Sequence, residues 1–119
     1  PGTLTVQEMS LVTGILDIAG REAAAAGALR INTVEVEVGL VAGVEIPALE
    51  FCFEVARKGT PGAEEARLVI REVPGRGTCV ECDSTVTVED FVALCSECGQ
   101  GLVDIEQGRD LRVLSINVD

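Results

Sequence analysis

Four of the five cysteines form two Cys-X-X-Cys pairs, and their spacing constrains the fold more than any other feature of the sequence. The pairs are Cys79 with Cys82 and Cys95 with Cys98, and 12 residues separate them. Two thiolates at positions i and i+3 of a turn point toward one position in space. Two such turns, joined by a short hairpin, place four sulfurs around a tetrahedral centre. We therefore predict a closed metal site.

The residues around the cysteines support this prediction. Residues 85–88 are alternating threonine and valine, which favour a β-hairpin between the two pairs. Gly99 follows the last cysteine and permits the unusual backbone that lets amide N–H groups approach sulfur.

The metal that this ligand set indicates is zinc in a structural role, because four thiolates leave no open coordination position. A rubredoxin-type iron site uses similar turns, but it normally has aromatic shielding, and the chain contains neither Tyr nor Trp. A disulfide framework is disfavoured by the odd number of cysteines and by their spacing. The fifth cysteine, Cys52, stands in an apolar helical pattern and is expected to be a small buried residue.

The charge of the chain excludes several classes of function. Twenty Asp and Glu against nine Lys and Arg give a net charge of −11, which repels phosphate backbones and anionic lipids. The segment 79–98 contains five carboxylates and no basic residue, so we predict neither a nucleic-acid partner nor a membrane partner. The chain has no histidine, which excludes schemes that need imidazole, and we predict that the protein is not an enzyme.

The sequence contains no segment typical of export. No apolar run approaches the roughly 20 residues that a membrane-spanning helix requires. The first residues lack the basic and strongly apolar parts of a secretory signal. We expect a cytoplasmic protein.

The periodicity of the apolar residues predicts two helices and three strands outside the cysteine segment. The first helix covers residues 9–28, with one wide apolar stripe that runs from Leu11 and Val12 through Ile15 and Ile18 to Ala26, and Gly27 closes it. The second begins at Pro47 and ends before Gly59. Strands are expected at 33–40, 66–73 and 111–118.

These elements predict an α+β fold: a small three-stranded sheet with two helices, plus an inserted zinc-ribbon-like module that contains the four paired cysteines. The expected domain limits are 1–77 with 108–119 for the α/β part, and 78–107 for the zinc-binding part, inserted before the last strand. Residues 74–77, Pro-Gly-Arg-Gly, have the composition of a hinge. In the last strand, Leu114, Ile116 and Val118 are expected to face the core. Exposed strand edges make a homodimer a further possibility.

The sequence as a whole resembles the HypA/HybF family of accessory proteins, which help to insert nickel into [NiFe] hydrogenases and, in some bacteria, urease. The resemblance covers nearly the whole chain, and it is carried by Glu8-Met9-Ser10, Gly14-Ile15-Leu16, Gly43-Val44-Glu45, Leu49, Phe51, Phe53-Glu54 and Val73-Pro74-Gly75-Arg76 leading into the cysteine pairs. It implies an α/β nickel-binding domain, a zinc domain, no catalytic turnover, and two partners: a GTPase accessory protein and the hydrogenase large subunit.

The same resemblance implies that nickel binds at Met-His-Glu at the start of family chains. The matching stretch here is Val6-Gln7-Glu8, so Gln7 stands where the family has histidine. A glutamine amide is a poor donor for Ni²⁺, which prefers imidazole and amine nitrogen. With no histidine in the chain, the candidate nickel ligands that remain are Gln7, Glu8 and Glu45. Each carboxylate also has an ordinary alternative role, Glu8 in a capping box with Thr5 and Glu45 as a solvated residue.

Two functions stay open at this point. The first is a metallochaperone that delivers nickel during maturation of [NiFe] hydrogenase and contains a structural zinc site. The alternative is a divergent zinc-ribbon interaction or regulatory module that no longer binds nickel tightly. A zinc-ribbon subunit of nucleic-acid machinery is disfavoured by the acidic charge.

Overall fold

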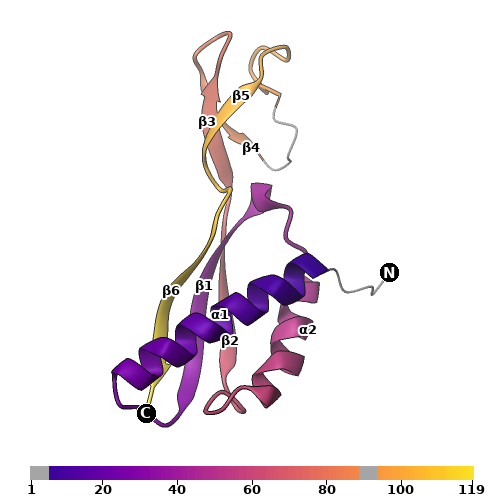
Figure 1. Ribbon diagram of the computed structural model, residues 1–119. Helices are drawn as coiled ribbons and strands as arrows, with labels where there is room; N and C mark the ends of the chain where they lie inside the picture. The colour runs from indigo at the N-terminus through magenta and orange to yellow at the C-terminus, as the bar shows by residue number, and fades with distance from the viewer. Residues whose placement is uncertain (1–5, 89–93) are drawn as a thin grey trace. The chain divides into compact units, whose positions relative to one another are not determined.

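The computed structural model describes residues 6–88 and 94–119, which fold into two α-helices and two three-stranded sheets (Figure 1). The predicted α+β class is confirmed. The first sheet has the strand order β2-β1-β6, and the second has the order β4-β3-β5. The elements in chain order are α1 (Val6–Ala25), β1 (Ile31–Gly39), the 3₁₀ helix η1 (Leu40–Ala42), α2 (Ile46–Ala56), the 3₁₀ helix η2 (Arg57–Gly59), β2 (Arg67–Val73), β3 (Gly75–Cys79), β4 (Thr85–Val88), β5 (Val103–Gln107) and β6 (Leu111–Val118).

The chain divides into two compact units. Of the described residues, the first unit comprises 6–36, Glu45–Ile70 and Val113–Asp119, and the second comprises Glu37–Val44, 71–88 and 94–112. The domain limits expected from the sequence, 1–77 with 108–119 and 78–107, describe parts that would fold independently. They stay a prediction.

Helix α1 buries only the central part of the wide apolar stripe that its sequence predicts. Val12, Ile15, Leu16, Ala19 and Ala23 are buried at spacings of one, three and four residues. The predicted stripe is too wide, because Leu11 is half-buried while Ile18 and Ala26 are exposed. The helix ends at Ala25, three residues before the expected end, because the chain turns where Gly27 adopts a φ of 69°. The N–H of Ala28 then bonds to the carbonyl of Ala23 at 2.9 Å, as in a Schellman motif.

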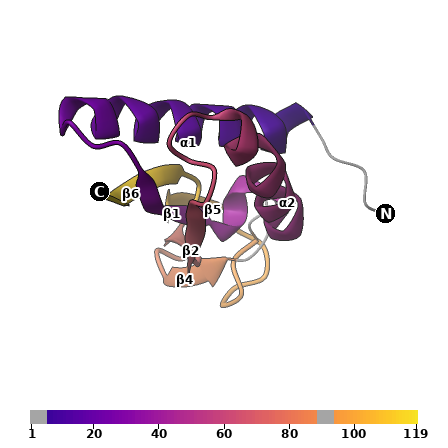
Figure 2. The ribbon, with the colours of Figure 1, turned by 90° about the horizontal axis from the view of Figure 1, so that it is seen from below.

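Helix α2 begins at Ile46, with Pro47 in its first turn as expected. Its buried residues Leu49, Cys52 and Phe53 recur at three and one, which gives a single apolar face. Figure 2 shows α1 on one side of the strands of the first sheet. Among the described residues, no helix is long and apolar enough to cross a membrane.

The first sheet is centred on β1, whose Val34, Val36 and Val38 are fully buried at alternate positions. Strands β1 and β2 run in the same direction and are connected through α2 (Figure 1). Strand β6 runs antiparallel to β1, because Gly39 N–H bonds to the carbonyl of Asp110 and Asp119 N–H to that of Arg30, each at 2.8 Å.

The last strand has the predicted limits, 111–118, but its predicted buried face is only partly correct. Ile116 and Val118 are half-buried, whereas Leu114 is 42% exposed. Strand β6 lies at the edge of its sheet, so its side chains have a neighbouring strand on one side only.

The second sheet corrects the hinge predicted at residues 74–77. Gly75–Cys79 is a strand, β3, and it is the central one, paired antiparallel with β4 and β5. The glycines permit close approach of backbones, since a Cβ on Gly75 would collide with the carbonyl of Val88 and one on Gly77 with that of Asp104. Closely spaced glycines often indicate a turn, but here they mark close strand packing. Strand β5 was not predicted from the sequence.

The second unit has a small core. Its buried cluster consists of Val41, Cys79, Val86, Val88, Cys95 and Val103, with Ile105 packed against it. Two of these six buried residues are cysteines of the Cys-X-X-Cys pairs. The apolar side chains of the cluster are aliphatic and few, so the cysteines supply a large part of the interior.

Phe53 and Phe51 offer a matched test of the first unit's core. Phe53 is fully buried, and Phe51 on the same helix is 55% exposed. We expect Phe53→Ala to lower the free energy of unfolding by about 3–5 kcal/mol, because it removes a buried ring and leaves a cavity. Phe51→Ala should change it by less than about 0.5 kcal/mol. Urea unfolding followed by helical circular dichroism measures both, and equal losses would contradict the described packing.

Candidate metal centre

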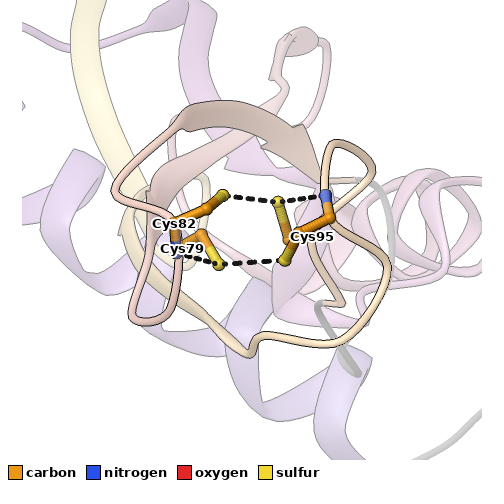
Figure 3. Close-up of side chains that lie close together, drawn as sticks. Cys79, Cys82 and Cys95 are labelled. Atoms are coloured by element: carbon orange, nitrogen blue, oxygen red, sulfur yellow. Dashed lines mark hydrogen bonds between the residues drawn. The ribbon is translucent and has the colours of Figure 1, made fainter.

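The four paired cysteines converge. The Sγ atoms of Cys79, Cys82, Cys95 and Cys98 all lie within 4.8 Å of one another. Across the two pairs, Cys79 Sγ lies 3.7 Å from Cys98 Sγ, and Cys82 Sγ lies 3.6 Å from Cys95 Sγ. Figure 3 shows Cys79 and Cys82 facing Cys95 across this centre. Among the described residues, these four cysteines form the group of possible metal ligands whose donor atoms lie close enough together to hold one ion.

The two turns hold their sulfurs in the same way. The N–H groups of Glu81 and Cys82 bond to Cys79 Sγ at 3.3 and 3.4 Å. In the second turn, the N–H groups of Glu97 and Cys98 bond to Cys95 Sγ at the same two distances. Each turn therefore directs two backbone dipoles at its first sulfur, which stabilises negative charge there.

Each turn also ends in a left-handed residue. Gly99 has a φ of 72°, which agrees with the conformation expected from its position. The equivalent residue after Cys82 is Asp83, with a φ of 60°. Aspartate is one of the few non-glycine residues that adopt this conformation readily, so the two turns are close copies despite different sequences.

Sequence reasoning missed Gly101. Its N–H bonds to Cys98 Sγ at 3.4 Å, and a Cβ at this position would collide with Cys79 Sγ and lie 2.8 Å from Cγ of Glu81. Gly101 thus packs directly against the sulfur centre. The second glycine of the run Cys98-Gly99-Gln100-Gly101 was the signal that could have identified it.

The surroundings of the sulfurs lower the pKa of some of the four cysteines and raise that of another. The hydroxyl and N–H of Ser84, a residue that the sequence did not single out, lower the pKa of the Cys82 thiol to about 6. The N–H groups of Gln100 and Gly101 lower the pKa of Cys98. At Cys79 the N–H of Cys82 favours the thiolate, but burial and the neighbouring thiols outweigh it and raise the pKa to about 11. Four thiolates so close together need a cation to be charged at once.

The sulfur positions fit a tetrahedral metal. A zinc–sulfur bond of about 2.3 Å implies a sulfur–sulfur edge of about 3.8 Å, close to the 3.6 and 3.7 Å observed. A disulfide needs about 2.05 Å, and all four cysteines are free. The cluster can therefore hold a tetrahedral ion with no position left for water.

The candidate nickel residues lie elsewhere, where α1 and α2 begin. Glu8 is 1% exposed, and its Oε2 accepts a hydrogen bond of 3.2 Å from the N–H of Glu45. Glu45 is the residue that precedes α2, so the Glu8 carboxylate lies at the positive end of that helix. The side chains of Gln7 and Glu45 are exposed. Thr5, the partner of Glu8 in the expected capping box, lies outside the described residues.

Cys52 is fully buried, as the sequence predicted. Burial raises the pKa of its thiol, and the negative charge of Glu8 raises it further. The side chain therefore stays neutral and packs as a small apolar group.

The chain matches one family model, described as hydrogenase/urease nickel incorporation, metallochaperone, HypA, over residues 6–118. Among curated proteins it is 41% identical over 114 residues to the hydrogenase maturation factor HypA of Chlorobaculum tepidum, covering 96% of this chain and all of that protein. The protein of the same name from Azotobacter chroococcum is 38% identical with the same coverage.

Two solved structures share the fold. One is the solution structure of the Ni metallochaperone HypA from Helicobacter pylori, with a TM-score of 0.67 and 23% identity, covering 93% of this chain and 96% of that one. The other, titled as a HypA solution structure, has a TM-score of 0.69 and 23% identity, covering 96% and 97%. At this identity the likeness concerns the fold.

Gly101 provides a test of the centre. We expect Gly101→Ala to weaken metal affinity by about 10- to 100-fold, because the added methyl group collides with Cys79 Sγ and overpacking costs about 1–3 kcal/mol. Competition between the protein and a chromogenic zinc chelator measures this affinity. The control is Gly20→Ala in α1, where an added Cβ meets nothing within 4 Å. Unchanged affinity in Gly101→Ala would contradict the described packing.

Proposed function

The chain belongs to the HypA family of hydrogenase and urease nickel-incorporation proteins, and on that premise we propose that it is a nickel metallochaperone acting in the maturation of [NiFe] hydrogenase. The observation that carries this proposal is the family match over residues 6–118, together with four cysteines in metal-binding geometry. The protein hands over an ion and catalyses no reaction. Nickel is its cargo.

The resident ion of the proposed function is zinc, bound by Cys79, Cys82, Cys95 and Cys98. The closed set of four thiolates favours a structural role, because catalytic zinc keeps one position for water. Its chemistry is to neutralise the thiolates and to connect the two turns. Iron in the same geometry is the alternative, and elemental analysis of the purified protein distinguishes the two.

Nickel would bind near the starts of α1 and α2, where Gln7, Glu8 and Glu45 are the candidates. Glu8 has a structural task as well, since its carboxylate accepts the N–H of Glu45. The chain has no imidazole to supply the nitrogen that Ni²⁺ prefers. This favours weak binding, as suits an ion that is passed on.

The second candidate function is an interaction or regulatory module that no longer binds nickel tightly. The specific observation in its favour is Gln7, which stands in place of the family histidine. The fold and the cysteine centre are the same under both proposals, so only nickel binding separates them.

The partners that we propose for delivery are a GTPase accessory protein and the hydrogenase large subunit. We propose that the protein acts in the cytoplasm, where such an enzyme subunit would receive its metal. The acidic surface disfavours nucleic acid and membrane lipids as partners. A homodimer through a sheet edge is compatible with delivery.

Nickel titration of the zinc-loaded protein tests the delivery function. We expect the parent chain to bind Ni²⁺ with micromolar affinity by calorimetry, and Gln7→His to bind at least about tenfold more tightly, because it supplies an imidazole nitrogen. The matched control is Glu22→His, which adds an imidazole at an exposed position of the same helix. Binding by Gln7→His alone would support the second candidate function instead.

Zinc removal tests the structural role of the cysteine centre. We expect a chelator to unfold residues 78–101, because the few buried aliphatic side chains cannot hold the two turns without the ion. Helical circular dichroism should be largely retained, since α1 and α2 lie in the first unit. Amide hydrogen exchange locates the change. Loss of all helicity would contradict this two-part behaviour.

A further inference from the structure

The metal-binding turns have three large apolar side chains on their outer side. Val80 is 63% exposed, Leu94 54% and Leu102 59%. A single exposed apolar residue needs no explanation, but three on one small module form a feature.

Backbone pairing places these three residues in one row. Val80 N–H bonds to the carbonyl of Leu102 at 3.0 Å, which continues the antiparallel ladder in which Cys79 pairs with Val103. Leu94 forms an antiparallel bridge with the same Leu102. Residues directly opposite in antiparallel strands project to the same face, with Cβ atoms about 4.5–5.5 Å apart. Leu102 therefore lies in the middle of the row.

The opposite face of the same backbone carries the metal centre. Cys79, Cys95 and Val103 each adjoin one residue of the row in sequence, and all three are buried. The core of the second unit contains none of Val80, Leu94 and Leu102. The row contributes nothing to the interior that would account for its apolar character.

The negative charge of the segment that contains the row indicates which kind of partner can bind there. Residues 77–107 contain seven Asp and Glu and no Lys or Arg. Five of these acids lie in the described part, and all five are exposed: Glu81, Asp83, Glu97, Asp104 and Glu106. A second copy would bring like charges together, whereas basic groups on a partner would be attracted to the module.

We propose that the row Val80–Leu102–Leu94 is a docking surface for a partner protein segment whose aliphatic side chains are flanked by lysine or arginine. The aliphatic groups cover the row, and the basic groups pair with exposed acids of the same module, such as Glu81 and Asp104. Binding of the partner segment to this surface does not require nickel. A negative peptide-binding result would therefore count against the docking surface and not against nickel delivery.

Fluorescence anisotropy of the zinc-loaded full chain with a labelled amphipathic peptide of leucine and lysine tests the proposal. We expect binding that falls as salt rises, and at least about tenfold weaker binding for Leu102→Ser, which removes the centre of the row. Leu29→Ser is the matched control, because Leu29 is 92% exposed and lies in the first unit. Unchanged zinc content shows that Leu102→Ser is folded.

Two further peptides separate the contributions. A peptide with serine in place of leucine keeps the charge, and one with glutamate in place of lysine keeps the leucines; we expect both to bind at least about tenfold more weakly. Equal binding of the parent and Leu102→Ser, or of the lysine and glutamate peptides, would overturn the proposal. So would sedimentation showing that Leu102→Ser converts a dimer into monomers, since the occupant would then be a second copy.

Discussion

Four sulfur atoms within 4.8 Å of one another are the constraint on which the second unit depends. Thiolates at this distance repel, so full ionisation of the group requires a cation at its centre. Two of the sulfurs belong to residues of the buried cluster, whose remaining members are four valines. An ion bound at this centre would therefore couple metal binding to formation of the core, as in small zinc modules generally.

The first unit has a different internal constraint, a carboxylate buried at the start of a helix. Glu8 belongs to α1, and its oxygen accepts the N–H of Glu45 where α2 begins. A cation that bound this carboxylate would compete with that N–H for the oxygen and would alter the charge at the positive end of α2. Any metal at this place is thus coupled to the junction of the two helices, and the buried thiol of Cys52, held neutral beside Glu8, adds no competing charge.

Local patterns predict the elements whose residues alternate or recur cleanly, and they fail where contacts between distant segments decide. The last strand could be predicted at both ends, and the convergence of the four paired cysteines followed from their spacing. The strand at Gly75 and Gly77 could not, because glycine marks both turns and close strand contact, and only the position of Val88 and Asp104 distinguishes them. The burial of Glu8 could not be predicted either, since its partner lies 37 residues away.

Successive side chains of a strand point to opposite faces, and this explains how one short module can carry a metal centre on one face and an apolar row on the other. Each inward residue of the turns has an outward neighbour: Val80 follows Cys79, Leu94 precedes Cys95 and Leu102 precedes Val103. The backbone geometry that directs sulfur to the centre therefore fixes the spacing of the apolar row on the other face. An ion that held the inner face in place would also hold the outer face, so we expect the aliphatic row to keep a defined shape only while the metal is bound.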